Sequence, residues 1–347
     1  MPSSSATSFL VLPGSTKAKT WSALARAVGM PPRYLPSVPN AEAGAIKAYL
    51  ESVVLPMVII GPDGTPQPVG TASIVATVER QLLILTARHN IDHVKNVDQP
   101  YGDRAHPSTP DIFRAELSKD IVIKNTYCYL VFPSLEGNKY SPIRSVAYKP
   151  EFDIALGYCV LPDGIELPAP LAIDTNPPQV GMKGRAIGYV GMNARIIQLD
   201  ERPSDILWEF EGQFSMSDCE VIGAEPRGSS LCRSPCFQIN VPIHSGMSGG
   251  PVINFPDDKT PALCGILTSD LSINPDTPTK ASGEKAMASA LWVSVSLSMW
   301  VGRSNGAKEE WTLLDLIKRE TIKDFGSAEF ELRPTKDGRT KIIPKLG

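Results

Sequence analysis

The sequence predicts an all-β protein, built as a sandwich or barrel of short strands. Runs rich in β-branched and aromatic residues recur along the chain and are bounded by Gly, Pro, Asp and Asn. Closely spaced runs of this kind favour strands joined by turns over alternating strands and helices. The chain also contains 32 prolines spread over its whole length, and each disfavours a long helix because proline lacks the backbone N–H.

The strand-like runs define a predicted central domain over residues 48–303. They include VVLPMVII, TASIVATV, QLLILTA, DIALGYCVL, GRAIGYVG, CFQINVPI, PVINF, LCGILTS and ALWVSVSL. An N-terminal extension over residues 1–47 precedes this domain. It is predicted to contain two short helices, one over TWSALARAVG and one entering NAEAGAIKAYLESVV with Asn40 as its N-cap.

A C-terminal extension is predicted over residues 304–347. The segment AKEEWTLLDLIKRETIKDFG carries apolar residues at helical spacing, which predicts an amphipathic helix. The segment FELRPTKDGRTKII follows, and its Asp337 and Gly338 predict a hairpin turn.

Composition and charge exclude several classes of partner. Apolar residues make up 42% of the chain, charged residues 20%, and the formal net charge is -3. Because no basic run stands out, nucleic acid is not expected as a partner. No apolar run reaches the roughly 18 residues of a membrane span, so no membrane association is expected. The N-terminus carries no secretory signal pattern, which predicts a cytoplasmic protein.

No cofactor or metal is predicted. The 6 cysteines are sparse, and they are expected to be reduced thiols. Cys232 and Cys236 have a loosely metal-like spacing, but no second Cys or His pair follows at zinc-finger distance. The segment GMKGRAIG could be misread as a phosphate loop, but it lacks the GKS or GKT of a Walker motif.

The segment HSGMSGGPVI, residues 244–253, points to nucleophilic catalysis. A serine hydroxyl needs a base to remove its proton and hydrogen-bond donors for the oxyanion that forms on an attacked carbonyl. The flanking glycines let backbone N–H groups turn towards a substrate. We therefore expect Ser248 as the nucleophile and the N–H groups of Gly246 and Ser248 as the oxyanion hole. The alternative is a glycine turn before a buried strand.

Of the four histidines, His89 is the best candidate for the base. It ends the apolar run QLLILTARH, so a rigid strand would hold a ring that the following loop leaves open. His244 lies close to Ser248 in sequence, but a tight loop gives its ring no reason to face the hydroxyl. His93 and His106 lie in polar sequence and are expected at the surface.

Asp153 is the candidate for the third member. It stands directly before the apolar residues Ile154 to Leu156, where an acid is costly to bury without a partner. The alternative is an ordinary exposed aspartate in a turn.

Three motifs in this order resemble those of trypsin-like (chymotrypsin-fold) serine peptidases. TARHN resembles the family pattern TAAHC, DIAL resembles DIALL, and GMSGGPV resembles GDSGGPV, especially in the bacterial branch with GMSGGP. The resemblance covers about residues 48–303. It implies two packed six-stranded antiparallel barrels and a catalytic triad of His89, Asp153 and Ser248.

Two departures from the family pattern matter. Asn90 stands where a cysteine often follows the family histidine, so that disulfide is absent. Met247 replaces the aspartate that, in the trypsin branch, pairs with a newly cleaved N-terminus. Activation by such clipping is therefore not expected, and control should come through loops, the extensions or a regulatory protein partner.

Family spacing also implies where substrate would bind. It puts Pro242 near the floor of the specificity pocket and Ile243 and His244 along its wall. Thr268 and Ser269 would lie along the substrate backbone. A further residue, Asp270, falls near the pocket rim, where it could favour a basic side chain or be only a turn aspartate.

The sequence thus predicts a serine endopeptidase that cleaves protein or peptide substrates through an acyl-enzyme. The alternative is a peptidase-fold binding or regulatory module with a latent site, which the two extensions and Met247 would suit. An esterase is disfavoured because its G-x-S-x-G elbow lies between a strand and a helix, whereas here the serine leads into the strand-like run PVINF.

Overall fold

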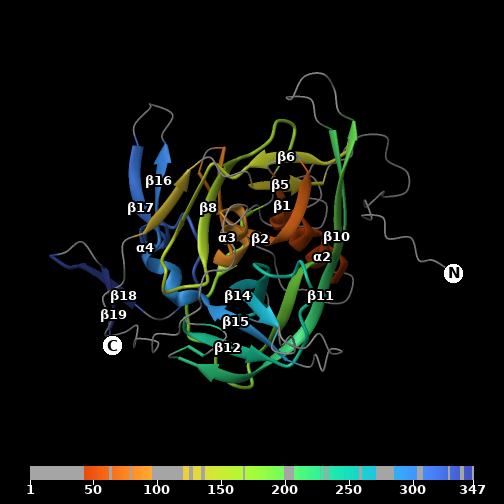
Figure 1. Ribbon diagram of the computed structural model, residues 1–347. Helices are drawn as coiled ribbons and strands as arrows, with labels where there is room; N and C mark the ends of the chain where they lie inside the picture. The colour runs from red at the N-terminus through yellow and green to blue at the C-terminus, as the bar shows by residue number, and fades with distance from the viewer. Residues whose placement is uncertain are drawn as a thin grey trace.

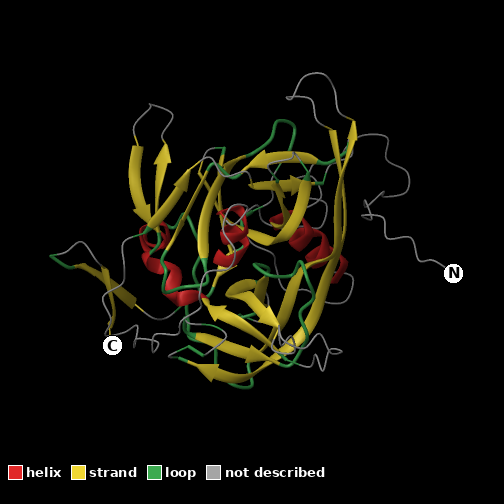
Figure 2. Cartoon of the chain, in the orientation of Figure 1, coloured by secondary structure: helices red, strands yellow, loops and turns green. Residues whose placement is uncertain are grey.

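In the computed structural model the chain is mostly β, as the sequence predicts. Two large, mainly antiparallel sheets pack against one another, one above the other in Figures 1 and 2. The structure describes residues 43–61, 65–78, 80–95, 120–124, 128–133, 137–166, 169–198, 207–226, 228–229, 232, 234–257, 260–270, 285–302, 308–326, 329–336 and 340–345.

The first sheet has eight strands, and every pairing in it is antiparallel. Its order is β4 (Ile121–Lys124), β7 (Ser145–Tyr148), β8 (Ala155–Val160), β3 (Gln81–Thr86), β2 (Pro66–Val78), β1 (Val54–Ile60), β5 (Cys128–Phe132) and β6 (Lys139–Pro142). This sheet curls strongly, but no pairing among the described strands closes it.

The second sheet forms a closed ring of six strands. Its order is β13 (Pro251–Asn254), β10 (Lys183–Gln198), β11 (Leu207–Glu225), β12 (Cys236–Ile239), β15 (Ala286–Ala290), β14 (Ala262–Asp270) and β9 (Ala172–Ile173). Pairing of β13 with β14 closes the ring, and the short β9 joins β14 in parallel. The predicted class, two packed β-barrels of the chymotrypsin type, is confirmed, with the first barrel curled and the second closed.

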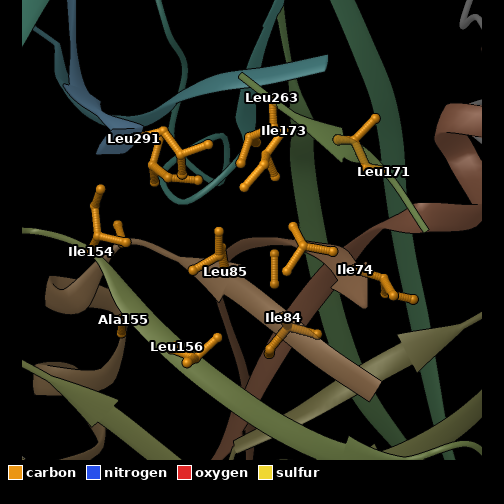
Figure 3. Close-up of a cluster of buried hydrophobic side chains, with 14 of the residues drawn as sticks. Ile74, Ile84, Leu85, Ile154, Ala155, Leu156, Leu171, Ile173, Leu263 and Leu291 are labelled. Atoms are coloured by element: carbon orange, nitrogen blue, oxygen red, sulfur yellow. The ribbon is translucent and has the colours of Figure 1, made fainter. Parts of the chain in front are cut away.

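The core lies between and within the two sheets. Figure 3 shows Ile74 and Leu85 of the first sheet facing Ile173 and Leu263 of the second, with Leu291 beside them. Each of these side chains is almost fully buried. Burial of one such side chain stabilises the fold by about 1.5–3 kcal/mol, so the apolar contacts fix how the two barrels sit relative to each other.

A long hairpin of β10 and β11 extends from the second barrel along the side of the first (Figure 1). Phe210 on β11 packs with Val58 and Val131 of the first sheet. The side chain of Asn138 donates a hydrogen bond to the Phe210 carbonyl at 3.2 Å. The hairpin therefore joins the barrels a second time, near the loop that carries Ser248.

The N-terminal helix is part of the first barrel. α2 (Ala43–Val53) buries Ile46, Leu50 and Val53 in the core. The helix crosses the predicted boundary between residues 47 and 48. Its buried side chains therefore stabilise the first barrel. The predicted helix TWSALARAVG lies outside the described residues.

The C-terminal extension differs from the prediction. The expected helix is only α4 (Leu313–Lys318), because the preceding residues form β17 (Lys308–Thr312), paired with β16 (Ser298–Gly302). Thr312 and Asp315 form a capping box that begins the helix at this point. The hairpin prediction is confirmed by β18 (Glu329–Pro334) and β19 (Thr340–Lys345), and its turn residues lie outside the described residues.

Two other short helical segments lie beside the strands. α3 (Arg88–Lys95) follows β3 directly, and a 3-10 helix (Leu291–Ser296) follows β15. The run LWVSVS was expected to be a strand, but the 3-10 turns bury all six of its residues. Of the helices in the described ranges, none has the length and apolar character needed to cross a membrane.

Candidate active site

The structure brings His89 and Asp153 together at one end of the first barrel. β3 pairs with β8 so that Thr86 lies opposite Ala155, and His89 and Asp153 lie just beyond these ends. The ring Nδ1 of His89 is 2.9 Å from Asp153 Oδ2, and the backbone N–H of His89 donates to Asp153 Oδ1 at 3.0 Å. Asp153 thus fixes both the ring and the backbone of His89.

The carboxylate of Asp153 is stabilised in its charged form. Its side chain is 19% exposed. Burial raises its pKa, but the charge and hydrogen bonds of His89, together with the charge of Arg88, outweigh burial and hold the pKa below its usual value. Because a carboxylate only accepts hydrogen bonds, Nδ1 carries a proton, and in the neutral form of the ring Nε2 is therefore the nitrogen with an acceptor lone pair.

The loop that carries Ser248 is shaped by turn hydrogen bonds and glycines. Met247 N donates to the His244 carbonyl at 3.0 Å, and Gly250 N donates to the Met247 carbonyl at 2.8 Å. Gly246 and Gly249 have φ angles of 96° and 84°, in the left-handed region that glycine adopts without strain. The glycines that suggested an oxyanion hole therefore have a direct conformational role.

The backbone N–H groups of Gly246 and Ser248 belong to this loop, beside the candidate nucleophile. Within the described part of the chain, no group accepts a hydrogen bond from the N–H of Gly246 or of Ser248. Both residues are partly exposed. A buried N–H without a partner is costly, so two donors left open beside a serine are available to an external acceptor.

The Ser248 loop is tied to the element that carries His89. The Ser248 carbonyl accepts hydrogen bonds from Thr71 N at 2.8 Å and from Asn90 Nδ2 at 2.9 Å. Asn90 directly follows His89 on α3, while Thr71 is on β2. Thr71 Oγ1 also donates to the Gly246 carbonyl at 2.7 Å. These contacts place the serine loop of the second barrel against the histidine-bearing end of the first.

The contacts of Thr71 and Asn90 were not anticipated as part of the site. Asn90 was singled out only as a departure from the family cysteine. Gly70, which directly precedes Thr71, carried no signal, because its contact with Asn90 depends on long-range packing.

Met247 anchors the serine loop by burial. Its side chain is 1% exposed and belongs to the main core. Its Cα would lie only 2.8 Å from a Cβ at Gly188, so the loop packs directly on β10. Where the trypsin branch uses an aspartate and an ion pair, this chain has an apolar side chain in the core.

The residues predicted to bind substrate vary in exposure. Ile243 is buried in the core, Pro242 is half-buried and His244 is exposed. Thr268 is buried, and its hydroxyl donates to the Met287 carbonyl at 3.4 Å. Ser269 and Asp270 are in β14, and their side chains lie outside the described residues, as do the side chain of His93 and all of His106. The pocket assignment stays a prediction.

The described residues contain no group of three or more His, Cys, Asp or Glu side chains that could hold a metal ion. All six cysteines are free and buried. Cys232 and Cys236, whose spacing resembled part of a zinc site, instead pack in a small apolar cluster with Met287.

The double-barrel fold, with a His–Asp pair at one barrel end and a glycine-flanked serine in a loop of the other barrel, is typical of trypsin-like peptidases. The family model of the trypsin-like peptidase domain matches residues 70–263, more than half of the chain. The chain therefore belongs to the trypsin-like peptidase family, whose substrates are proteins.

Solved structures with a similar backbone include the following two. The chain is 13% identical to the Rv3671c protease from M. tuberculosis in its active form, covering 81% of this chain and 89% of that one, with a TM-score of 0.41. It is 15% identical to Deg5, covering 73% and 91%, with a TM-score of 0.40. No curated protein matches the sequence.

Proposed function

We propose that the chain is a serine endopeptidase that cleaves protein substrates through an acyl-enzyme on Ser248. One observation carries the proposal: Asp153 binds both the backbone N–H and the ring Nδ1 of His89. That pairing presents Nε2 of the neutral ring as a base, which is what a serine hydroxyl requires. An aspartate that only stabilised a turn would not be expected to bind both the backbone and the ring of a partly exposed histidine.

In the first half of the reaction, Ser248 Oγ attacks the scissile carbonyl while His89 Nε2 takes its proton. The carbonyl oxygen becomes an oxyanion, which accepts hydrogen bonds from the N–H groups of Gly246 and Ser248. Loss of one such donor typically costs about a hundred- to a thousandfold in rate. His89 then delivers its proton to the leaving amine, and the C–N bond breaks to leave an ester on Ser248.

In the second half, water replaces the amine. His89 takes a proton from the water as it attacks the ester carbonyl, and returns it to Ser248 Oγ as the acid leaves. Asp153 remains ionised throughout and stabilises the imidazolium that forms twice in each turnover. Its lowered pKa supports this role, since a protonated carboxyl could not act in this way.

The test is cleavage of an unstructured protein substrate and of a peptide library by the full chain. Ser248→Ala should abolish both activities while leaving the circular dichroism spectrum and the melting temperature close to wild type. Cleavage retained in Ser248→Ala would reject the assignment. A wild-type chain that neither cleaves nor reacts with a fluorophosphonate would instead support the binding-module alternative.

A further inference from the structure

The side-chain amide of Asn90 connects the first barrel to the serine loop. Its side chain is fully buried, at 0% exposure. The Nδ2 group donates one hydrogen bond to Thr86 Oγ1 at 3.1 Å and one to the Ser248 carbonyl at 2.9 Å. Both hydrogens of the NH2 group are therefore used, and the second bond crosses from the first barrel to a residue 158 positions away.

The amide oxygen of the same side chain differs from its NH2 group. No group in the described part of the chain bonds to Asn90 Oδ1, which is buried. An unsatisfied buried oxygen is destabilising. The two hydrogen bonds donated by the NH2 group must therefore offset this cost.

The surrounding glycines make room for this amide. A Cβ at Gly70 would lie 2.2 Å from Asn90 Nδ2 and 2.6 Å from the Ser248 carbonyl oxygen. A Cβ at Gly249 would lie 2.6 Å from Asn90 Nδ2. Both distances to the amide are shorter than any ordinary contact, so the Asn90 amide occupies a slot between two glycines, one from each barrel.

The groups that Asn90 binds have other partners. Thr86 Oγ1 donates to the Thr71 carbonyl at 2.7 Å, and the Ser248 carbonyl also accepts a hydrogen bond from Thr71 N at 2.8 Å. If the amide were removed, Thr86 Oγ1 and the Ser248 carbonyl would each keep one hydrogen bond. This argues against a role limited to stability, because an apolar side chain of similar size would satisfy the fold equally well.

We propose that Asn90 is a positioning residue that holds the Ser248–Gly249 peptide and thereby fixes the nucleophile and its oxyanion donors relative to His89. Since Asn90 directly follows His89, a single turn of α3 carries both the base and the amide that binds the Ser248 carbonyl. Thr71 fixes the other side of the loop by binding the Gly246 carbonyl. The inference rests on the proposed peptidase function, and it gives the Asn90 amide, together with Thr71, the role of aligning the serine loop with His89.

The test compares Asn90→Leu with wild type in the full chain. The measurements are the second-order rate of fluorophosphonate inactivation between pH 5 and 9, kcat and KM for a peptide substrate, and the melting temperature. We expect the plateau rate and kcat to fall about tenfold to a hundredfold, as for a misplaced catalytic group. The midpoint of the pH profile, KM and the melting temperature should stay close to wild type.

Ser141→Ala is the matched control. Ser141 is 3% exposed, and its hydroxyl donates to the Val160 carbonyl at 2.7 Å within the same barrel. This variant should lower the melting temperature and leave the inactivation rate unchanged. Asn90→Met is the second test variant, because its side chain also lacks the N–H donors and its flexible, unbranched chain adapts to an irregular space. It should reproduce the loss of rate, and it decides the question if Asn90→Leu does not fold.

The outcomes separate the two proposals. If wild type is inactivated at Ser248 and the rate for Asn90→Leu or Asn90→Met is within threefold of wild type, the role of Asn90 alone is overturned. A loss of rate accompanied by a shifted pH midpoint or a lowered melting temperature also overturns it. The loss would then come from a change in His89 or in the stability of the fold. A wild-type chain that does not react overturns both proposals.

Discussion

Replacing Asp153 with asparagine should nearly abolish catalysis while keeping a side chain of the same shape in the site. The asparagine would keep one oxygen, which can still accept the His89 backbone N–H at the present 3.0 Å. Its NH2 group would then face the ring Nδ1, which now lies 2.9 Å from Oδ2. Because an NH2 group only donates, Nδ1 would become the acceptor and the ring proton would move to Nε2.

The expected magnitude follows from that change of tautomer. A protonated Nε2 cannot accept the hydroxyl proton of Ser248, and the same substitution in the best-studied triad lowers kcat about 10⁴-fold. Each tenfold change corresponds to 1.36 kcal/mol, so the loss of transition-state stabilisation is about 5 kcal/mol. The assay is kcat/KM for a peptide substrate at neutral pH, with the fluorophosphonate rate as a second readout.

Asp163→Asn is the control for loss of a paired carboxylate. Asp163 Oδ1 lies 2.6 Å from Arg80, but its side chain is 96% exposed, and a surface pair contributes little. This variant should retain wild-type rates. Asp153→Asn with less than a tenfold loss would refute the reasoning, since His89 would then not depend on Asp153 for its tautomer.

Three further outcomes are expected. Gly249→Ala should slow fluorophosphonate labelling about a hundredfold or more, because its Cβ would lie 2.2 Å from the Thr71 carbonyl at a φ of 84°; labelling within threefold of wild type would contradict this. Met247→Asp should lower the free energy of unfolding by about 3 kcal/mol or more in urea titrations, because the buried site offers no ion pair; an unchanged midpoint would argue against the anchor. The ionised form of Asp153 stabilises the fold above its unfolded pKa of about 3.9, because its folded pKa is lower. That stabilisation is lost as pH falls through the folded value, so the gap in melting temperature between wild type and Asp153→Asn should be largest near pH 7 and close at more acidic pH; a constant gap would exclude the linkage.

The all-β class was predictable because its signals are local, whereas the division into two barrels was implied only by the resemblance of three motifs to trypsin-like peptidases. Strand-forming runs, turns and the absence of long helices are written in neighbouring residues. His89 and Asp153 could also be placed, since each ends or begins an apolar strand and a polar side chain there lies at the barrel end. Their hydrogen bonds in the structure agree with that placement.

The C-terminal extension was harder to predict because two patterns compete. Trp311, Leu314 and Ile317 have helical spacing, but Trp311 belongs to β17 and pairs with β16. In that pairing the backbone N–H and C=O groups of β17 bond to β16. The two strands meet only in the folded chain, so the spacing of apolar residues does not reveal the pairing. In the same way, LWVSVS alternates like a strand, yet Ser294 Oγ bonds back to the Leu291 carbonyl at 2.7 Å in a 3-10 turn.

The contacts that hold the serine loop were not predictable from the sequence. The slot for the Asn90 amide requires Gly70 and Gly249 to be placed on opposite sides of it, and these residues come from different barrels. Substrate-pocket residues were likewise assigned by family spacing alone. Ile243 shows the difficulty, since the structure buries it in the core.

The most direct measurement is to react the wild-type chain with a fluorophosphonate, digest it and map the modified residue by mass spectrometry. We expect one adduct, on the peptide that contains Ser248, and we expect it to form far more slowly in His89→Ala. An adduct on another residue, or one that forms at the same rate without the imidazole, would contradict it.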